Sequence, residues 1–165
     1  MIPVVVLLDN IRSMYNVGSF FRTADAAGVE RLLLGGITGK PPKSAIAKTA
    51  LGAEQRVPWQ HKWSAVDFIG PLVEEGYEIA AVETHPRAVD LFEWTPKFPV
   101  CLMFGHEVDG LQPELIRAAA TLVRIPMLGS KRSLNVATAG GVAVYELLRK
   151  YRSIAPAAEA ERRDG

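Results

Sequence analysis

Short apolar runs alternate with helical patterns along the chain. Five of the runs are apolar throughout, as expected for strands that are covered on both faces. A sixth segment, 56–62, is less apolar and suits an edge strand. Strands that alternate with helices predict a parallel sheet in a doubly wound α/β domain. The five buried strands are predicted at 3–9, 31–36, 78–84, 99–105 and 122–127, and the helices at about 16–28, 44–54, 64–76, 112–120 and 135–152.

A single domain is expected at 1–152, because the apolar pattern continues to about residue 152 and then stops. The segment 153–165 is rich in small and charged residues and has little apolar content with which to pack. We therefore predict a flexible tail there.

The composition is that of a compact globular protein, with 48% hydrophobic and 22% charged residues in a chain of 165. Because 19 basic and 18 acidic residues leave a net charge of +1, any site for a polyanion must be local. Cys101 lies in an apolar run and has no second cysteine as partner, so we expect an inert buried thiol and no metal. The apolar run at the N-terminus stops at Asp9, which favours a cytoplasmic protein without a signal sequence or membrane span.

Ligand chemistry is expected in the loops that follow the carboxyl ends of the strands. The familiar nucleotide motifs do not fit those loops. The loop GGITGKPPKS has Pro41 where a phosphate-binding loop has Ser or Thr, and no G-x-G-x-x-G follows any strand. A P-loop nucleotidase and a Rossmann dehydrogenase are therefore disfavoured.

Arg22 lies in the middle of the helical segment 16–28, opposite its apolar side. Two interpretations of this helix stay open. In one, Asn16 caps the helix and Arg22 is a solvated charge; in the other, Arg22 faces a functional cleft. The apolar side follows the i, i+3, i+4, i+7 rule and is predicted to consist of Val17, Phe20, Phe21, Ala24 and Ala27.

Two further loop junctions carry polar residues. In FGHEVDGL (104–111), two glycines bracket Glu107 directly after a buried strand, a pattern that suits either a tight turn or a site. In IPMLGSKRSLNVATAGG (125–141), Ser133 and Asn135 precede the last helix. Helix capping would by itself explain either of these two residues.

Together these segments resemble the motifs of the SpoU/TrmH family of RNA ribose methyltransferases, within the SPOUT superfamily. The resemblance runs from about residue 3 to 152. The chain differs from the family at Val108, where glycine is frequent, and at Gly140 and Gly141, which replace bulkier residues. The matching patterns are NxGxxxRTADAxG (16–28), FGxExxGL (104–111) and IPMxGxxxSLNVAxA (125–139), and LGAEQRVPW (51–59) is also similar to a family segment.

The resemblance implies a parallel-sheet SPOUT (α/β knot) domain with a C-terminal trefoil knot. It also implies S-adenosylmethionine as cofactor and a homodimer, formed through the first and last helices, in which two subunits share each active site. Gly105, Ile125 and Leu134 match the positions that hold the cofactor. Glycine lets the backbone approach a ligand closely, and Ile125 and Met127 can line an adenine slot.

Methyl transfer to a ribose 2′-hydroxyl needs an aligned nucleophile and help in losing its proton. The resemblance assigns this work to Arg22, supported by Asn16, Glu107, Ser133 and Asn135. Arginine is a poor general base, because a guanidinium has a pKa above about 12. We favour a second role, in which Arg22 grips an RNA phosphate and stabilises the charge that develops on the 2′-oxygen, but the sequence leaves both roles open.

Basic residues near the expected site are candidates for contacts with RNA phosphates, although each is also explained as a solvated charge. They are Lys40, Lys43 and Lys48, around the Gly/Pro loop after the second strand, and Lys131 and Arg132, inside the third motif.

Transfer RNA is the first expectation for the substrate and ribosomal RNA the second. The sequence identifies neither the nucleotide nor any need for a partner protein. Two alternatives remain: a catalytically silent RNA-binding protein of the same fold, and a small-molecule methyltransferase.

An unpaired base could stack on Trp59, His61 and Trp63, although tryptophans at such positions are more often part of a core or a subunit interface.

Overall fold

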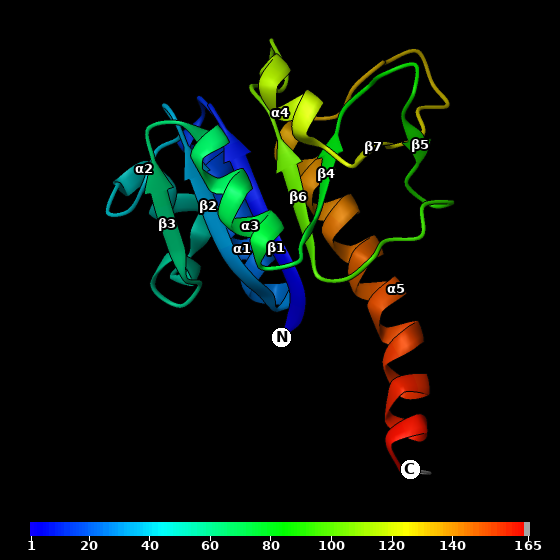
Figure 1. Ribbon diagram of the computed structural model, residues 1–165. Helices are drawn as coiled ribbons and strands as arrows, with labels where there is room; N and C mark the ends of the chain where they lie inside the picture. The colour runs from blue at the N-terminus through cyan, green and yellow to red at the C-terminus, as the bar shows by residue number, and fades with distance from the viewer. Residues whose placement is uncertain (164–165) are drawn as a thin grey trace.

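The computed structural model describes the backbone of residues 1–163 and the side chains of residues 1–155 (Figure 1). The strands of this part are β1 (Ile2–Asp9), β2 (Val29–Gly35), β3 (Trp59–Lys62), β4 (Glu78–Val82), β5 (Val89–Asp90), β6 (Val100–Phe104) and β7 (Thr121–Arg124). They form one sheet in the order β3-β2-β1-β6-β4-β7-β5, and every pair is parallel. The predicted parallel α/β sheet is confirmed.

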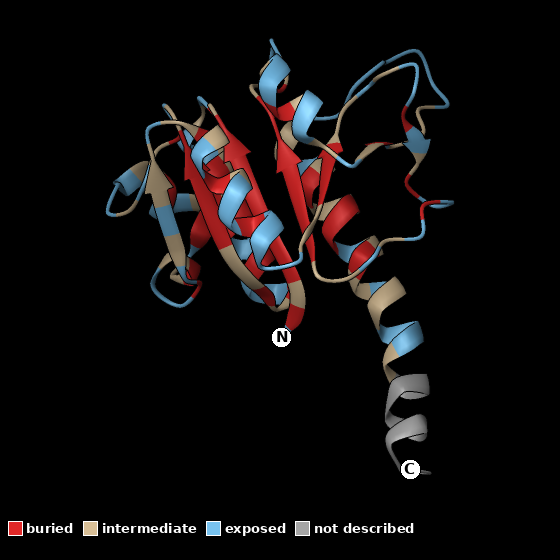
Figure 2. Cartoon of the chain, in the orientation of Figure 1, coloured by how far each residue is buried: buried red, intermediate tan, exposed pale blue. Residues whose placement is uncertain are grey.

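Helices cover both faces of the sheet, and Figure 2 shows the buried residues concentrated on its central strands. On one face lie α1 (Met14–Ala27), α2 (Ser44–Ala50) and α5 (Val136–Arg163). On the other lie α3 (Ile69–Glu74) and α4 (Pro113–Ala118). Successive side chains of β1 alternate between the two apolar layers, as the geometry of a strand requires. Val4, Val6 and Leu8 pack in the layer of α1, and Val5 and Leu7 in the layer of α3.

The two edges of the sheet differ in how well the sequence predicts them. β3 is an edge strand, as its weaker apolar pattern indicates. The opposite edge is β5, which has only two residues and was not predicted, because two residues carry no period. The predicted helices at 44–54 and 64–76 are also shorter: α2 ends before Leu51, which has a positive φ of 53°, and α3 begins at Ile69.

α1 begins and ends with capping groups. The Ser13 side chain accepts a hydrogen bond from the Asn16 N–H at 3.2 Å, and the helix ends at Gly28, which has a φ of 73°. The helix cap is therefore Ser13, not Asn16 as one interpretation of the sequence held. The predicted apolar side is confirmed, since Val17, Phe20, Phe21, Ala24 and Ala27 are all buried.

α5 packs on α1 through a glycine. A Cβ atom at Gly140 would lie 2.2 Å from Cε1 of Phe20, whereas nothing lies within 4 Å of a Cβ at Gly141. Gly140 therefore permits the close approach of α1 and α5. The helix continues to Arg163, beyond its predicted end at about 152. The flexibility of 153–165 stays a prediction, and residues 164–165 lie outside the described part of the chain.

Candidate active site

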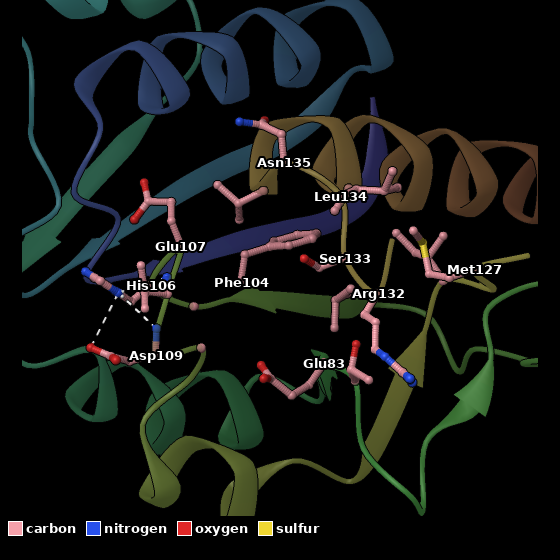
Figure 3. Close-up of a pocket in the computed structure, with 18 residues that line it drawn as sticks. Glu83, Phe104, His106, Glu107, Asp109, Met127, Arg132, Ser133, Leu134 and Asn135 are labelled. Atoms are coloured by element: carbon pink, nitrogen blue, oxygen red, sulfur yellow. Dashed lines mark hydrogen bonds and ion pairs between the residues drawn. The ribbon is translucent and has the colours of Figure 1, made fainter. Parts of the chain in front are cut away.

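A cavity of about 410 Å³ lies where β4, β6 and β7 end, on the side of the sheet where ligands were expected. Figure 3 shows His106, Glu107 and Asp109 on one side of it, with Met127, Arg132 and Ser133 on the other. All four residues expected to bind the cofactor line it. So do three of the five expected to be catalytic. These seven are Gly105, Ile125, Met127 and Leu134, with Glu107, Ser133 and Asn135.

Gly105 is required by the loop itself. A Cβ atom there would lie 2.1 Å from the backbone nitrogen of Leu111 and 2.2 Å from the carbonyl carbon of Gly110. An added side chain would strike the chain's own backbone, so the fold itself requires a glycine here. Its role in holding the cofactor stays a prediction.

The loop after β6 closes as a tight turn. The His106 N–H donates to the Gly110 carbonyl at 3.1 Å, and the Gly110 N–H donates to the His106 carbonyl at 2.9 Å. The left-handed backbone of this turn falls on Gly110, with a φ of 71°, and not on Val108. Val108 is exposed, so the turn has room for a valine side chain at this position.

Glu107 reaches from this turn to the start of α1. One carboxylate oxygen accepts hydrogen bonds from the Ser13 N–H at 3.0 Å and the Asn16 side-chain amide at 3.2 Å; the other accepts from the Arg12 N–H at 3.1 Å. Partial burial disfavours the charged carboxylate. The hydrogen bonds from Ser13, Arg12, Asn16 and the Glu107 N–H outweigh that effect, so the pKa of Glu107 lies below its ordinary value.

Asn135 extends the hydrogen bonds of Glu107 and Asn16 to the start of α5. Its amide nitrogen donates to the Asn16 side-chain oxygen at 3.3 Å. Its own oxygen accepts from the N–H groups of Ala137 and Thr138 at 2.9 and 3.2 Å, which caps α5. Asn16 must therefore present its nitrogen to Glu107 and its oxygen to Asn135. Each amide orientation is fixed by its neighbours, and the three motif segments meet at one place.

Arg22 does not line this cavity in its own chain, and its expected position facing a functional cleft stays a prediction. It is exposed and borders a separate hollow between α1, α2 and α5, together with Lys48 and Tyr145. No hydrogen bond or ion pair of its guanidinium occurs with the described side chains.

The expected RNA contacts are divided between two places. Arg132 lines the cavity and Lys131 is exposed beside it, whereas Lys40 and Lys43 are exposed in the loop between β2 and α2. Trp59 is partly buried and packs against the core, while Trp63 is exposed.

Glu83 is a residue of the cavity that the sequence analysis missed. It follows β4 directly, at a strand end like those of the other motifs. A carboxylate at the carboxyl end of a strand was the one feature of the sequence that could have indicated it. Its carboxylate accepts a hydrogen bond from the Leu111 N–H at 3.3 Å. Burial raises the pKa of Glu83, and that hydrogen bond offsets the rise only in part.

Other expectations concern groups outside the cavity. Cys101 is buried as predicted, and burial raises the pKa of its thiol to about 12, which makes it unreactive. No group of three His, Cys, Asp or Glu residues is placed to hold a metal ion among the residues that the structure describes. In the same part of the chain, no helix has the length and apolar character needed to cross a membrane.

Comparison with known protein families gives one match over most of the chain. The model of the SpoU rRNA Methylase family matches residues 3–145, a range that includes all three motif segments. The 23S rRNA (guanosine-2′-O-)-methyltransferase RlmB of Ralstonia nicotianae is 32% identical over 155 residues, which cover 94% of this chain and 61% of that protein. The tRNA (guanosine(18)-2′-O)-methyltransferase of Aquifex aeolicus is 31% identical over 153 residues, with coverages of 88% and 69%. The chain spans about three fifths of the length of the curated relatives that match first.

Solved structures share the fold. An AdoMet-bound rRNA methyltransferase from Sinorhizobium meliloti has a TM-score of 0.83 and 34% identity, over 88% of this chain and 56% of that one. A structure described as giving insights into the 2-OH methylation of C/U34 on tRNA has a TM-score of 0.82 and 28% identity. It matches 91% of this chain, and the match covers 97% of its own.

Proposed function

Because the chain belongs to the SpoU rRNA Methylase family and has the fold of SPOUT methyltransferases, we propose that it transfers a methyl group from S-adenosylmethionine to a ribose 2′-hydroxyl of RNA. The main structural support for this proposal is a chain of hydrogen bonds beside the cavity. It runs from Glu107 through Asn16 to Asn135 and joins the three motif segments. Helix capping accounts for the oxygen of Asn135 but not for Asn16, whose side chain takes no part in capping α1.

The residues of the cavity suit S-adenosylmethionine. Its volume of about 410 Å³ lies within the range of small-molecule sites, roughly 300 to 1,000 Å³. Ile125, Met127 and Leu134 offer apolar surface for an adenine ring, and the carboxylates of Glu83 and Glu107 complement a positively charged ligand. When bound, the cofactor supplies the electrophilic methyl group of a sulfonium. The C-terminal trefoil knot expected for this fold is part of the proposal.

Arg22 is proposed to act on the cavity of a second copy of the chain, in a homodimer formed through α1 and α5. Two features support this assignment: Arg22 is absent from the cavity of its own chain, and it borders a hollow between those helices. The half-exposed rings of Tyr15 on α1 and Tyr145 on α5 supply apolar surface for such a contact. There Arg22 would hold an RNA phosphate and stabilise the charge on the 2′-oxygen, or would accept its proton.

Transfer RNA is the proposed substrate, with ribosomal RNA as the second candidate. Both kinds of substrate occur in the names of the relatives. The tRNA assignment is supported by the structure concerned with C/U34 of tRNA, because the match covers nearly all of that chain. The exposed or cavity-lining residues Lys40, Lys43, Lys131 and Arg132 are the proposed phosphate contacts. A cytoplasmic location is part of the same proposal.

The test combines calorimetry with methyl transfer. We expect S-adenosylmethionine and its demethylated product to bind, and labelled methyl groups to enter bulk tRNA from a deletion strain. Nuclease digestion and mass spectrometry should then identify a 2′-O-methylated nucleoside. RNA binding without cofactor binding would instead indicate a silent RNA-binding protein. Cofactor binding with methylation of a small molecule, and none of tRNA or rRNA, would indicate a small-molecule methyltransferase.

A further inference from the structure

We propose that Trp63 stacks on an unpaired base of the RNA substrate, a few nucleotides from the ribose at the cavity. This inference rests on the proposed function. Trp63 follows β3 directly, so it lies at the end of the sheet where the cavity lies. Its side chain is 82% exposed, although a tryptophan is among the most costly residues to leave in water.

The indole is held in place from one side. The His61 ring packs edge-on against it, with ring centroids 4.9 Å apart and an interplanar angle of 85°. His61 is itself fixed by a 3.0 Å hydrogen bond between its Nε2 and the Gly36 carbonyl. A ring that is already positioned loses less conformational entropy when a base stacks on it.

Hydrogen bonds connect Trp63 to the cavity through neighbouring loops, which we call the rim: Asn10–Ser13, Gly36–Lys43 and Lys62–Trp63. The Gly36 N–H donates to the Lys62 carbonyl at 3.0 Å, and the Ile37 N–H donates to the Asn10 side chain at 3.0 Å. The Arg12 N–H then donates to Glu107, which lines the cavity. In Figure 1 the arrowheads of β3, β2, β1 and β6 lie at the same end of the sheet, where these loops begin.

The charges of the rim favour a nucleic acid. Arg12, Lys40 and Lys43 are exposed, and none of the three side chains has a hydrogen bond or ion pair with the described part of the chain. The Glu107 carboxylate already accepts hydrogen bonds from backbone and amide groups. Since the whole chain has a net charge of only +1, three available cations beside an exposed indole form a local site for a phosphate backbone and a base.

The spacing agrees with a single-stranded segment. Three strand intervals separate β3 from β6, and at about 4.8 Å each they place Trp63 on the order of 14 Å from the strand that leads into the cavity. Ile37, which is 64% exposed and lies between the two, adds apolar surface along the path. A base on Trp63 therefore belongs to a nucleotide near the methylated one, in a loop or an end rather than a helix.

Trp63→Ala tests this contact, with Trp63→Phe as the variant that keeps a stacking ring. With bulk tRNA at one salt concentration, Trp63→Ala should weaken binding and raise the KM for RNA by about five- to a hundredfold. The maximal rate and the affinity for S-adenosylmethionine should not change, and Trp63→Phe should keep most of the RNA affinity. Phe92→Ala is the matched control, because Phe92 is 57% exposed but follows β5 at the opposite edge.

Three results would overturn the inference. One is wild-type RNA affinity in Trp63→Ala while methylation proceeds, which would leave the proposed function intact. Another is a loss of dimer in sedimentation with Trp63→Ala, which would make the indole a subunit contact. The third is a wild-type protein that neither binds nor methylates RNA, and in that case the proposed function fails as well.

Discussion

Asn16 has a role that depends on two residues far away in the chain. Ser13 caps α1, which leaves the Asn16 amide for Glu107, 91 residues away, and for Asn135, 119 residues away. An amide has a donor end and an acceptor end, so it can link a carboxylate to a second amide in one orientation only. This arrangement holds the turn after β6, the start of α1 and the start of α5 together at the cavity.

Glu107→Gln should make the stability of the protein less dependent on pH. The folded state lowers the pKa of Glu107, so this carboxylate contributes stability above its ordinary pKa of 4.5, and the contribution is lost as the pH falls through the folded pKa. At pH 7 the variant should therefore unfold at lower urea concentration than the wild type, and the difference should shrink in acid. A difference in the urea midpoint that is the same at every pH would show that the charge of Glu107 is not involved.

Arg22→Ala should leave the fold and the cofactor affinity unchanged, because Arg22 is exposed and outside the cavity. Methyl transfer to RNA should fall by at least about a hundredfold in single-turnover assays. Transfer at the wild-type rate would make Arg22 an ordinary surface charge.

Arg22→Lys distinguishes the two roles of this residue. Lysine keeps the charge and loses a proton more readily than arginine, but it lacks the planar fork that grips a phosphate. Activity that persists and rises with pH would indicate proton abstraction. Activity as low as that of Arg22→Ala would indicate the grip on phosphate or oxyanion, which we expect.

Two glycines have different structural roles, one in a turn of the backbone and one in the packing of two helices. Gly105 keeps the turn after β6 closed, and Gly140 lets α5 approach Phe20 on α1. The sequence shows glycine in both segments. It could not indicate what each glycine faces, because that depends on neighbours brought together by folding.

Gly105→Ala should disrupt the turn that carries Glu107. The new methyl group would lie 2.1 Å from the Leu111 nitrogen, so the turn must shift, and both the urea midpoint and the affinity for S-adenosylmethionine should fall. Gly129→Ala is the control, since a Cβ there meets nothing within 4 Å. Equal affinity of the two variants for S-adenosylmethionine, measured by calorimetry, would show that cofactor binding does not depend on the shape of this turn.

Gly140→Ala and Gly141→Ala should have opposite effects on stability. At Gly140 the methyl group would strike the Phe20 ring, and overpacking of this kind costs about 1 to 3 kcal/mol. At Gly141 the space is open, and Ala in place of Gly in a helix stabilises by about 0.5 to 1 kcal/mol. Urea unfolding measures both, and two changes of the same sign would show that Gly140 does not set the approach of α5 to α1.

Much of the whole fold could be predicted from the sequence, because the central strands are apolar on both faces and alternate with helices. β1 and β6 are the clearest cases, since nearly every side chain in them is buried. The order of the strands could not be predicted, because β1 lies between β2 and β6 through contacts that no local pattern encodes. Of the expected catalytic residues, Glu107, Ser133 and Asn135 were correctly assigned to one cavity by their motifs. Asn16 and Arg22 do not line it. For Arg22, the proposed sharing of each site between two chains would explain this, and no pattern within one chain encodes such a contact.

The sharing of each proposed methylation site between two chains can be tested directly with a mixed dimer. Chains carrying Arg22→Ala and Asn135→Ala are given different tags and purified together, so that every dimer contains one of each. Circular dichroism verifies that each variant is folded, which matters because Asn135 caps α5. If Arg22 of one chain serves the cavity of the other, one of the two sites is intact, and the mixed dimer should methylate tRNA at about half the wild-type rate. A mixed dimer as inactive as the two parent variants would show that Arg22 does not serve the cavity of the other chain.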